Sequence, residues 1–402
     1  MPGTLPDDPI IRRLVQQARA AQLTRRAVLA GAGGIATAAT LAACAAGEKA
    51  KPTAAKDVSA TEKTLAWSNW PAYMDEDDDG NHPTLDAFEK QSGITVTYNV
   101  DVDDNNSYYA KVRDQLALGQ DIGADTVCLT DWMVGRWITL GYTQELDHAN
   151  IPNISNLVPD LEDPDFDPGR KNSLPWQGGF AGLAWNTEKV PNGLKSIDDL
   201  WDPSLKGKVG VLSEMRDTIG LLMLSQGVDI SGDFTADQFQ AAIDLFTKEV
   251  NDGQIRNVKG NAYLEDLQNE DTLAAIVWSG DITTINGEVG YEKWKFAIPD
   301  SGGTIWNDNF LVPIGAAHKA NAEALMNYYY EPEVAAEVAA WVNYITPVVG
   351  AKEAMESIDP DLAENQLIFP SDETLATVKR FRTLTSAEEQ QFGAAFQAVL
   401  LG

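Results

Sequence analysis

The 402-residue chain has few of the residues on which most metal, redox and nucleic-acid sites depend. It contains two cysteines and three histidines, and its 30 Lys and Arg stand against 60 Asp and Glu, for a formal net charge of −30. The shortage of basic residues argues against nucleic-acid binding, because phosphates call for a basic surface, and it disfavours docking on anionic lipid. With 44% hydrophobic and 22% charged residues, the composition is that of an acidic, folded protein of two or three domains.

Motifs for catalysis and for cofactor or metal binding are also missing from the sequence. It has no G-x-S-x-G, no GxGxxG that opens a helix and no G-x-x-x-x-G-K-[ST], so no cofactor is expected. The three histidines, His82, His148 and His318, stand alone, so no metal site is expected either. Since 60 acids can pair by chance, a secreted hydrolase with two catalytic carboxylates remains an alternative.

One acidic segment imitates a calcium loop. In Asp75–Gly80, aspartates stand at loop positions one, three and five and glycine at position six. Position twelve is Asp86, where a calcium loop has a bidentate Glu. We therefore expect a solvated acidic loop.

The N-terminal segment is expected to direct export. Arg25 and Arg26 precede a mildly apolar stretch, 27–43, which at 17 residues is marginal for a membrane helix. It runs into Leu41-Ala42-Ala43-Cys44, and the whole resembles a twin-arginine lipoprotein signal peptide, 1–43, whose lipobox cysteine becomes the lipidated first residue. A retained membrane anchor is the alternative.

Lipidation of Cys44 would leave a tether and a single free thiol. Residues 44–61 are mostly Ala, Lys, Thr, Pro and Glu without periodicity, which is typical of a flexible linker. Cys128 lies in the apolar run Asp125–Leu129, so we expect a buried, inert thiol and no intrachain disulfide. These features predict a protein in the cell envelope, on the outer face of the cytoplasmic membrane, that contacts the membrane only through its lipid.

From Thr64 onward, short strand-like runs alternate with helical ones, as in α/β proteins whose parallel strands are crossed by helices. The expected strands are 64–67, 94–100, 126–129, 182–185, 209–212, 272–277, 294–298 and 310–312. The expected helices are 84–91, 107–118, 132–140, 196–200, 216–226 and 236–248, followed by a helical tail from about 321 to 401. Two α/β lobes fit this length better than one large sheet.

Aromatic and acidic residues gather at the ends of expected strands, where ligands bind in parallel α/β sheets, and in one case just before an expected strand. The segments are Asn69-Trp70-Pro71-Ala72-Tyr73, Thr130-Asp131-Trp132, Ser213-Glu214-Met215-Arg216-Asp217, Trp278-Ser279-Gly280-Asp281 and Trp306-Asn307-Asp308. Any single Trp is more often part of a core. Together, carboxylates that bind ammonium groups and rings that take methylene chains suit a flexible organic cation.

Segments spread over about 62–375 carry a family resemblance. They are Asn69-Trp70 with Tyr73, Phe166-Asp167-Pro168, Ser173-Leu174-Pro175-Trp176, Asp199-Leu200-Trp201-Asp202-Pro203 with Lys206-Gly207, Ile276-Val277-Trp278-Ser279-Gly280, Trp306-Asn307-Asp308, and Tyr344-Ile345-Thr346-Pro347. In this order they resemble the spermidine/putrescine-binding proteins of bacterial ABC importers, within the extracellular solute-binding lipoproteins.

The resemblance implies an α/β, two-lobed, periplasmic-binding-protein-like (type II) fold with a hinged ligand cleft. Lobe 1 would comprise 62–177 and 310–402, with the late helices packing across both lobes, and lobe 2 would comprise 178–309. The chain would cross between them near 176–179 and 308–310. Such a protein is a monomeric receptor and not an enzyme: it closes on putrescine or spermidine and delivers the ligand to a membrane permease.

The resemblance also assigns the ligand contacts. The aromatic box would be Trp70, Tyr73, Trp132, Trp278 and Trp306; the main carboxylate Asp308; the carboxylates at the other end Glu214 and Asp217; and further lining residues Thr130 and Tyr344. Ala72 stands where the family often has an acid, for which Asp131 or an acid of 75–79 could compensate, and Phe381 falls near a family amide. The same fold with a quaternary ammonium compound or a sugar as ligand is the alternative.

Overall fold

The computed structural model describes residues 51–401; the expected signal peptide, Cys44 and the first part of the tether lie outside this range. A mixed ten-stranded sheet has the order β2-β1-β3-β9-β4-β7-β5-β6, with β10 beside β9 and β8 beside β4. The strands are β1 (Thr64–Asn69), β2 (Thr95–Val100), β3 (Thr126–Thr130), β4 (Ser173–Asn186), β5 (Val209–Leu212), β6 (Ile255–Lys259), β7 (Ala274–Trp278), β8 (Trp294–Ala297), β9 (Gly303–Leu311) and β10 (Val378–Lys379).

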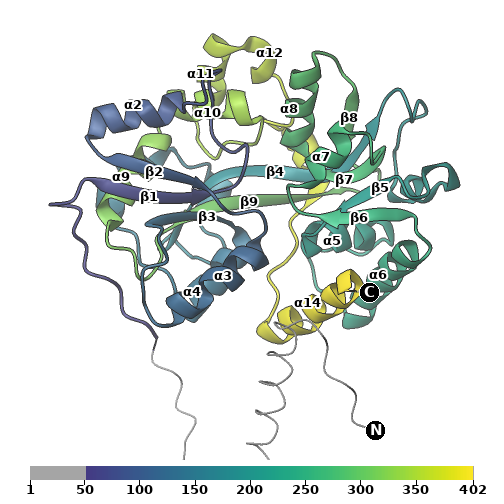
Figure 1. Cartoon of the computed structure of the whole chain (residues 1–402), viewed down its shortest axis with the longest axis horizontal. Helices are drawn as coiled ribbons and strands as arrows, with labels where there is room; N and C mark the ends of the chain where they lie inside the picture. Colours follow the sequence, from purple (N-terminus) through teal and green to yellow (C-terminus); the bar gives the residue numbers. More distant parts are fainter. Residues whose placement is uncertain (1–50, 402) are drawn as a thin grey trace, which may run out of the picture. The chain divides into compact units, whose positions relative to one another are not determined.

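Helices cover both faces of this sheet (Figure 1). They are α2 (Pro83–Ser92), α3 (Asn105–Ala117), α4 (Asp131–Leu140), α5 (Met215–Ser225), α6 (Ala236–Asn251), α7 (Tyr263–Gln268), α8 (Ser279–Val289), α9 (Lys319–Tyr329), α10 (Pro332–Val342), α11 (Ala351–Ile358), α12 (Pro360–Ala363), α13 (Asp372–Leu375) and α14 (Ser386–Leu401). The expected helix at 196–200 is a 3-10 helix, Ile197–Trp201. Among residues 51–401, no helix is both long and apolar enough to cross a lipid bilayer.

Two strands, β4 and β9, run side by side across the middle of the molecule (Figure 1). They pair antiparallel from Ser173 opposite Leu311 to Ala181 opposite Thr304. At one end of this pair β9 adjoins β3, and at the other end β4 adjoins β7 and β8. These two strands therefore join the two halves of the sheet.

The buried hydrophobic residues form two clusters, one on each half. The first cluster is built from β1 to β3, α2 to α4 and α9 to α11, and the second from β5, β7, α5, α6 and α8. Along β4, membership changes between Trp176 and Ala181. The C-terminal helix α14 adds Phe392 and Phe396 to the second cluster, and the Phe392 ring stacks on Phe239 at 4.0 Å between centroids.

Local sequence signals account for several helix ends. Thr235 and Gln238 form a capping box at the start of α6, where it satisfies free backbone N–H groups. Pro332 and Pro360 each begin a helix, where the missing N–H group of proline costs nothing. In α5 the N-cap is Glu214, whose carboxylate accepts from the N–H of Arg216 at 3.3 Å.

The thiol lies as the sequence predicts, whereas the acidic loop is exposed only at 76–80 and its first acid, Asp75, is buried. Cys128 is fully buried in β3, and burial raises the pKa of its thiol well above the ordinary value, so it is inert. Asp75 accepts from the backbone N–H of Thr84 at 2.8 Å, and Asp77 accepts from the N–H of Asn81 at 2.9 Å. Within 51–401, no three His, Cys, Asp or Glu side chains come together to hold a metal ion.

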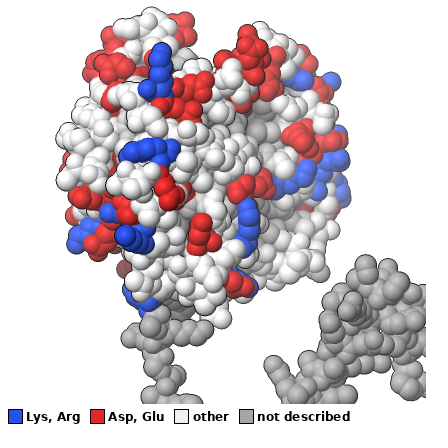
Figure 2. Space-filling view, turned by 60° about the vertical axis from the view of Figure 1, so that its left-hand side comes forward, with Lys and Arg blue, Asp and Glu red and all other residues white. Residues whose placement is uncertain are grey.

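Acidic and basic side chains are interspersed on the face shown in Figure 2, so charge is spread over that surface.

Candidate ligand-binding site

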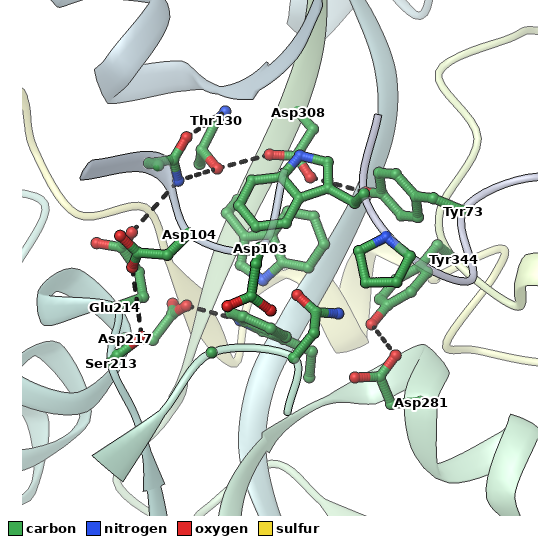
Figure 3. A pocket seen from close by; sticks show the side chains of 17 residues that line it. Tyr73, Asp103, Asp104, Thr130, Ser213, Glu214, Asp217, Asp281, Asp308 and Tyr344 are labelled. Atoms are coloured by element: carbon green, nitrogen blue, oxygen red, sulfur yellow. Dashed lines mark hydrogen bonds between the residues drawn. The ribbon is translucent and has the colours of Figure 1, made fainter. Parts of the chain in front are cut away.

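A cavity opens where the loops after β1, β2, β3, β5, β6 and β7 converge, and β9 passes beside it (Figure 3). Its empty space, counted out into the open mouth, is about 540 Å³. The lining residues come from elements of both halves of the sheet. They are Trp70, Pro71, Tyr73, Asp103, Asp104, Asn105, Thr130, Ser213, Glu214, Asp217, Gly260, Asn261, Trp278, Asp281, Trp306, Asp308 and Tyr344.

The charge of this lining has one sign. Six of the lining residues are carboxylic acids, and none is Lys, Arg or His. The acids are Asp103, Asp104, Glu214, Asp217, Asp281 and Asp308. A concave, partly dehydrated surface with charges of one sign concentrates ions of the opposite sign, so the cavity favours a cation.

Asp308, on β9, is held by two hydroxyl groups. Its Oδ1 accepts from the Thr130 hydroxyl at 2.6 Å and its Oδ2 from the Tyr73 hydroxyl at 2.9 Å. The side chain is buried, and this burial raises the pKa of Asp308 to about 7, although both hydrogen bonds lower it. A cation beside Asp308 would favour the ionised form and lower that pKa again.

Asp281, in the first turn of α8, has a similar environment. It accepts from the hydroxyl of Tyr344 at 2.9 Å and from that of Tyr263. Burial raises the pKa of Asp281 to about 6, while the two tyrosines lower it. Asp281 and Asp308 thus lie at separate places on the cavity wall, each fixed by a tyrosine hydroxyl (Figure 3).

The acids of α5 line a third place on the wall. Asp217 accepts from the indole N–H of Trp278 at 2.8 Å and from the hydroxyl of Thr304 at 2.6 Å. Glu214 accepts from the Asn105 amide at 3.4 Å. Burial raises the pKa of Glu214 to about 8, although the nearby Arg216 guanidinium lowers it, and burial also raises the pKa of Asp217.

Aromatic rings form a chain along the cavity. The Tyr344 ring lies 5.5 Å from both the Tyr73 and the Trp306 ring, and Trp306 lies 6.4 Å from Trp278. Such a chain presents ring faces and edges to an apolar or cationic ligand.

Two glycines make room for the Tyr344 ring. A Cβ atom at Gly179, in β4, would lie 2.8 Å from Cδ1 of Tyr344, and one at Gly280, in α8, would lie 2.7 Å from Cε2. Both distances are far below van der Waals contact. The position of Tyr344 in the cavity therefore depends on two residues that have no side chain.

Nine of the eleven residues singled out in the sequence line this cavity: Trp70, Tyr73, Thr130, Glu214, Asp217, Trp278, Trp306, Asp308 and Tyr344. Asp131 and Trp132 do not. Asp131 is paired with Arg380 and accepts from the amide of Asn309 at 2.8 Å. The Trp132 ring is covered by the guanidinium of Arg216, 4.1 Å from its centroid. Both side chains are thus engaged by the protein itself, in a neighbouring cavity.

The structure also adds lining residues that the sequence did not single out. Asp281 belongs to a strand-end segment already noted for Trp278, and the same signal could have found it. Asp103, Asp104 and Asn105 follow the end of β2, which is a strand-end position too. No acid of 75–79 reaches the cavity, and Ala72, with φ of 54°, turns the backbone between Trp70 and Tyr73.

Comparison with known proteins places the chain among binding proteins. The family described as bacterial extracellular solute-binding protein matches residues 83–369. The spermidine/putrescine-binding periplasmic protein 1 of Haemophilus influenzae is 28% identical over 339 residues, which cover 84% of this chain and 89% of that protein. The putrescine-binding periplasmic protein PotF of Escherichia coli is 28% identical over 330 residues, covering 78% and 85%.

The fold is shared with solved structures. The spermidine/putrescine ABC transporter substrate-binding protein PotD of Streptococcus pneumoniae superposes with a TM-score of 0.68 at 22% identity, covering 85% of this chain and 99% of that one. The match confirms the expected α/β, type II periplasmic-binding-protein-like fold.

Proposed function

Because this chain belongs to the bacterial extracellular solute-binding proteins, which are receptors and not enzymes, we propose that it captures a polyamine and delivers it to the permease of an ABC importer. The family membership removes the carboxylate-pair hydrolase from consideration. Both curated relatives described above are named for putrescine, and one of them also for spermidine.

The observation that carries the proposal is the one-sided charge of the cavity. Six acids line it without a single basic side chain. A neutral sugar would leave these carboxylates unbalanced, and a quaternary ammonium group has no N–H to donate to them. The protonated amines of putrescine or spermidine supply both a positive charge and several N–H donors, which carboxylates bind in charge-assisted hydrogen bonds.

The roles of the individual residues follow from their positions. Asp308 and Asp281 would each take an ammonium group, since both are buried, held by tyrosine hydroxyls and ready to ionise beside a cation. Trp278, Trp306 and Tyr344 would cover the methylene chain between the charged ends. Each ring can add about 0.5–2 kcal/mol of cation–π attraction where an ammonium lies over it.

Capture is proposed to close two lobes on the ligand. The cavity draws its lining from elements of both hydrophobic clusters, so a ligand that touches both sides favours the conformation in which they lie together. The permease would then bind this closed form. We also propose that the N-terminal signal directs export, that Cys44 is lipidated and that the receptor is a monomer.

Calorimetric titration tests the ligand class. The chain from residue 51 onward, which forms one compact unit, is titrated with putrescine, spermidine, choline, betaine and maltose at two salt concentrations. We expect saturable one-to-one binding of a polyamine, weaker at high salt because the charge pairing is screened, and no heat from maltose. A response confined to choline, betaine or maltose would overturn the polyamine assignment and leave the fold intact.

A further inference from the structure

A second cavity adjoins the first and has a different charge pattern. It shares Thr130, Glu214, Asp217 and Trp306 with the first cavity as lining residues, and its empty space, open to solvent, is about 2110 Å³. In contrast to the first cavity, it is lined by four arginines: Arg136, Arg216, Arg380 and Arg382. Glu214 and Asp217 line both cavities. The charged residues of the first cavity are all acids, whereas those of the second include arginines as well.

Arg216 lies at this boundary. It stands in α5 between the two shared acids and is only 7% exposed. Its guanidinium carbon is 4.1 Å from the centroid of the Trp132 ring, and its Nη1 is 3.9 Å from Oε1 of Glu214. It also forms an ion pair with Glu389 of α14.

The surroundings of Arg216 repeat the chemistry of a cation site. A ring face and a carboxylate, Trp132 and Glu389, hold the guanidinium much as a tryptophan and an acid would hold a ligand ammonium. Arg136 pairs with the same Glu389 at 2.9 Å and lies 4.8 Å from the same ring. Two arginines thus share the carboxylate of Glu389, and Arg216 also faces Glu214.

We propose that Arg216 occupies, as a built-in cation, the place that a further ligand ammonium would need, and so ends the ligand site and selects diamines over triamines. This inference rests on the proposed polyamine function. The first cavity has an acid for each end of a diamine, Asp308 and Asp281. A third ammonium that extended past Glu214 toward Trp132 would meet the buried positive charge of Arg216, and like charges repel more strongly where water is excluded.

The test compares two arginine-to-methionine variants. Arg216→Met removes the proposed stop, and of the two arginines only Arg136 then contacts Trp132 and Glu389. Arg382→Met is the matched control, because this arginine also lines the second cavity, pairs with Glu388 and lies 4.2 Å from the Phe234 ring. Affinities for putrescine and spermidine are measured by calorimetry for both variants and the unsubstituted protein.

The expected results concern the ratio of the two affinities. The unsubstituted protein prefers putrescine, Arg216→Met shifts the ratio toward spermidine by about tenfold or more, and Arg382→Met leaves the ratio as it was. A preference of the unsubstituted protein for spermidine, an unchanged ratio in Arg216→Met, or an equal shift in both variants would overturn the inference.

A further variant covers the case in which Arg216→Met does not fold. Glu389→Gln keeps both arginines and removes their shared carboxylate, so the ratio is expected to move further toward putrescine; movement toward spermidine would count against a positive stop. Absence of binding of either polyamine by the unsubstituted protein is a distinct result, because it refutes the proposed function itself.

Discussion

The hydroxyl group of Tyr73 donates a hydrogen bond of 2.9 Å to the carboxylate of Asp308, a residue 235 positions further along the chain. The bond joins the loop after β1 to the strand β9, and both side chains are buried in the wall of the cavity. A carboxylate fixed in this way needs no reorganisation when a cation arrives, which favours tight binding.

Replacing this carboxylate should weaken ligand binding more than any surface change. Asp308→Asn keeps the shape and the two hydroxyl partners but removes the charge that pairs with an ammonium. We expect a loss of about 3 kcal/mol, or roughly a hundredfold in Kd for putrescine, measured by calorimetry. The control is Asp300→Asn, an exposed acid just before β9, which should leave the Kd unchanged. Retained affinity in Asp308→Asn would refute its role.

The affinity for a polyamine should rise with pH between about 5.5 and 8. Without ligand, burial raises the pKa of Asp308 to about 7 and that of Asp281 to about 6, so both are partly protonated in this window. Binding of a cation requires the ionised forms and therefore releases protons. Titrations in two buffers with different ionisation enthalpies measure the number of protons released, and zero at pH 6.5 would contradict this account.

The same carboxyl groups should make the unliganded protein less stable as the pH rises. Asp308 has a higher pKa in the folded than in the unfolded chain, where it titrates near the ordinary value of 3.8. Between these two values the folded state holds more protons, so the free energy of unfolding falls with increasing pH. Urea titrations between pH 5 and 8 should show a shallower fall for Asp308→Asn than for the unsubstituted protein. An equal fall with pH in both proteins would show that the raised pKa belongs to a group other than Asp308.

A methyl group at Gly280 should disturb the Tyr344 ring. The new Cβ would lie 2.7 Å from that ring, so Tyr344 must move and its hydrogen bond to Asp281 must change. We expect Gly280→Ala to weaken putrescine binding about tenfold, since a misplaced contact in a binding site readily costs about 1.4 kcal/mol. Gly287→Ala in the same helix is the matched control, because a Cβ there meets nothing within 4 Å. It should keep the affinity and slightly raise the Tm.

Removal of the Phe392 ring should destabilise the fold through the second cluster. The side chain is 2% exposed and stacks on Phe239, so Phe392→Ala should lower the free energy of unfolding by about 3–5 kcal/mol. Leu401→Ala in the same helix, at 84% exposure, should change it by less than about 0.5 kcal/mol. A similar small effect for both, in chemical denaturation, would show that α14 does not support the second cluster.

The sequence predicted the strands that read as short apolar runs, and with them the strand ends that line the cavity. β5 was predicted at its observed bounds, 209–212, and β1 to β3 within a few residues. The first half of β4 was not predicted, because Pro175 and the glycines after Gln177 are typical of turns. Contacts with residues far away in the sequence explain a glycine inside this strand: at Gly179 the rings of Trp306 and Tyr344 leave no room for a side chain.

The cavity was predicted less completely than its strands. Strand ends can be recognised from local sequence, and they located Trp70, Glu214 and Trp278. Trp306 and Asp308 were expected just before a strand and lie inside β9, and Tyr344 was assigned only through the family resemblance. The partner of a side chain can lie far away in the sequence. For this reason Asp131 and Trp132 were expected in the first cavity but line the neighbouring one. Asp131 is paired with Arg380, which lies 249 positions away, and Trp132 is covered by Arg216 from another helix. Neither partner is visible in the sequence around residue 131.

The pairing of β4 with β9 also limits how the two halves of the molecule can move. Two strands joined by a ladder of hydrogen bonds cannot slide past each other by one residue, since every side chain would then point to the opposite face. Opposite pairs such as Gln177 and Asp308 therefore keep their register in every folded conformation. If the two halves open as proposed, they would do so by bending and twisting this pair of strands, and Asp308 would keep its place opposite Gln177.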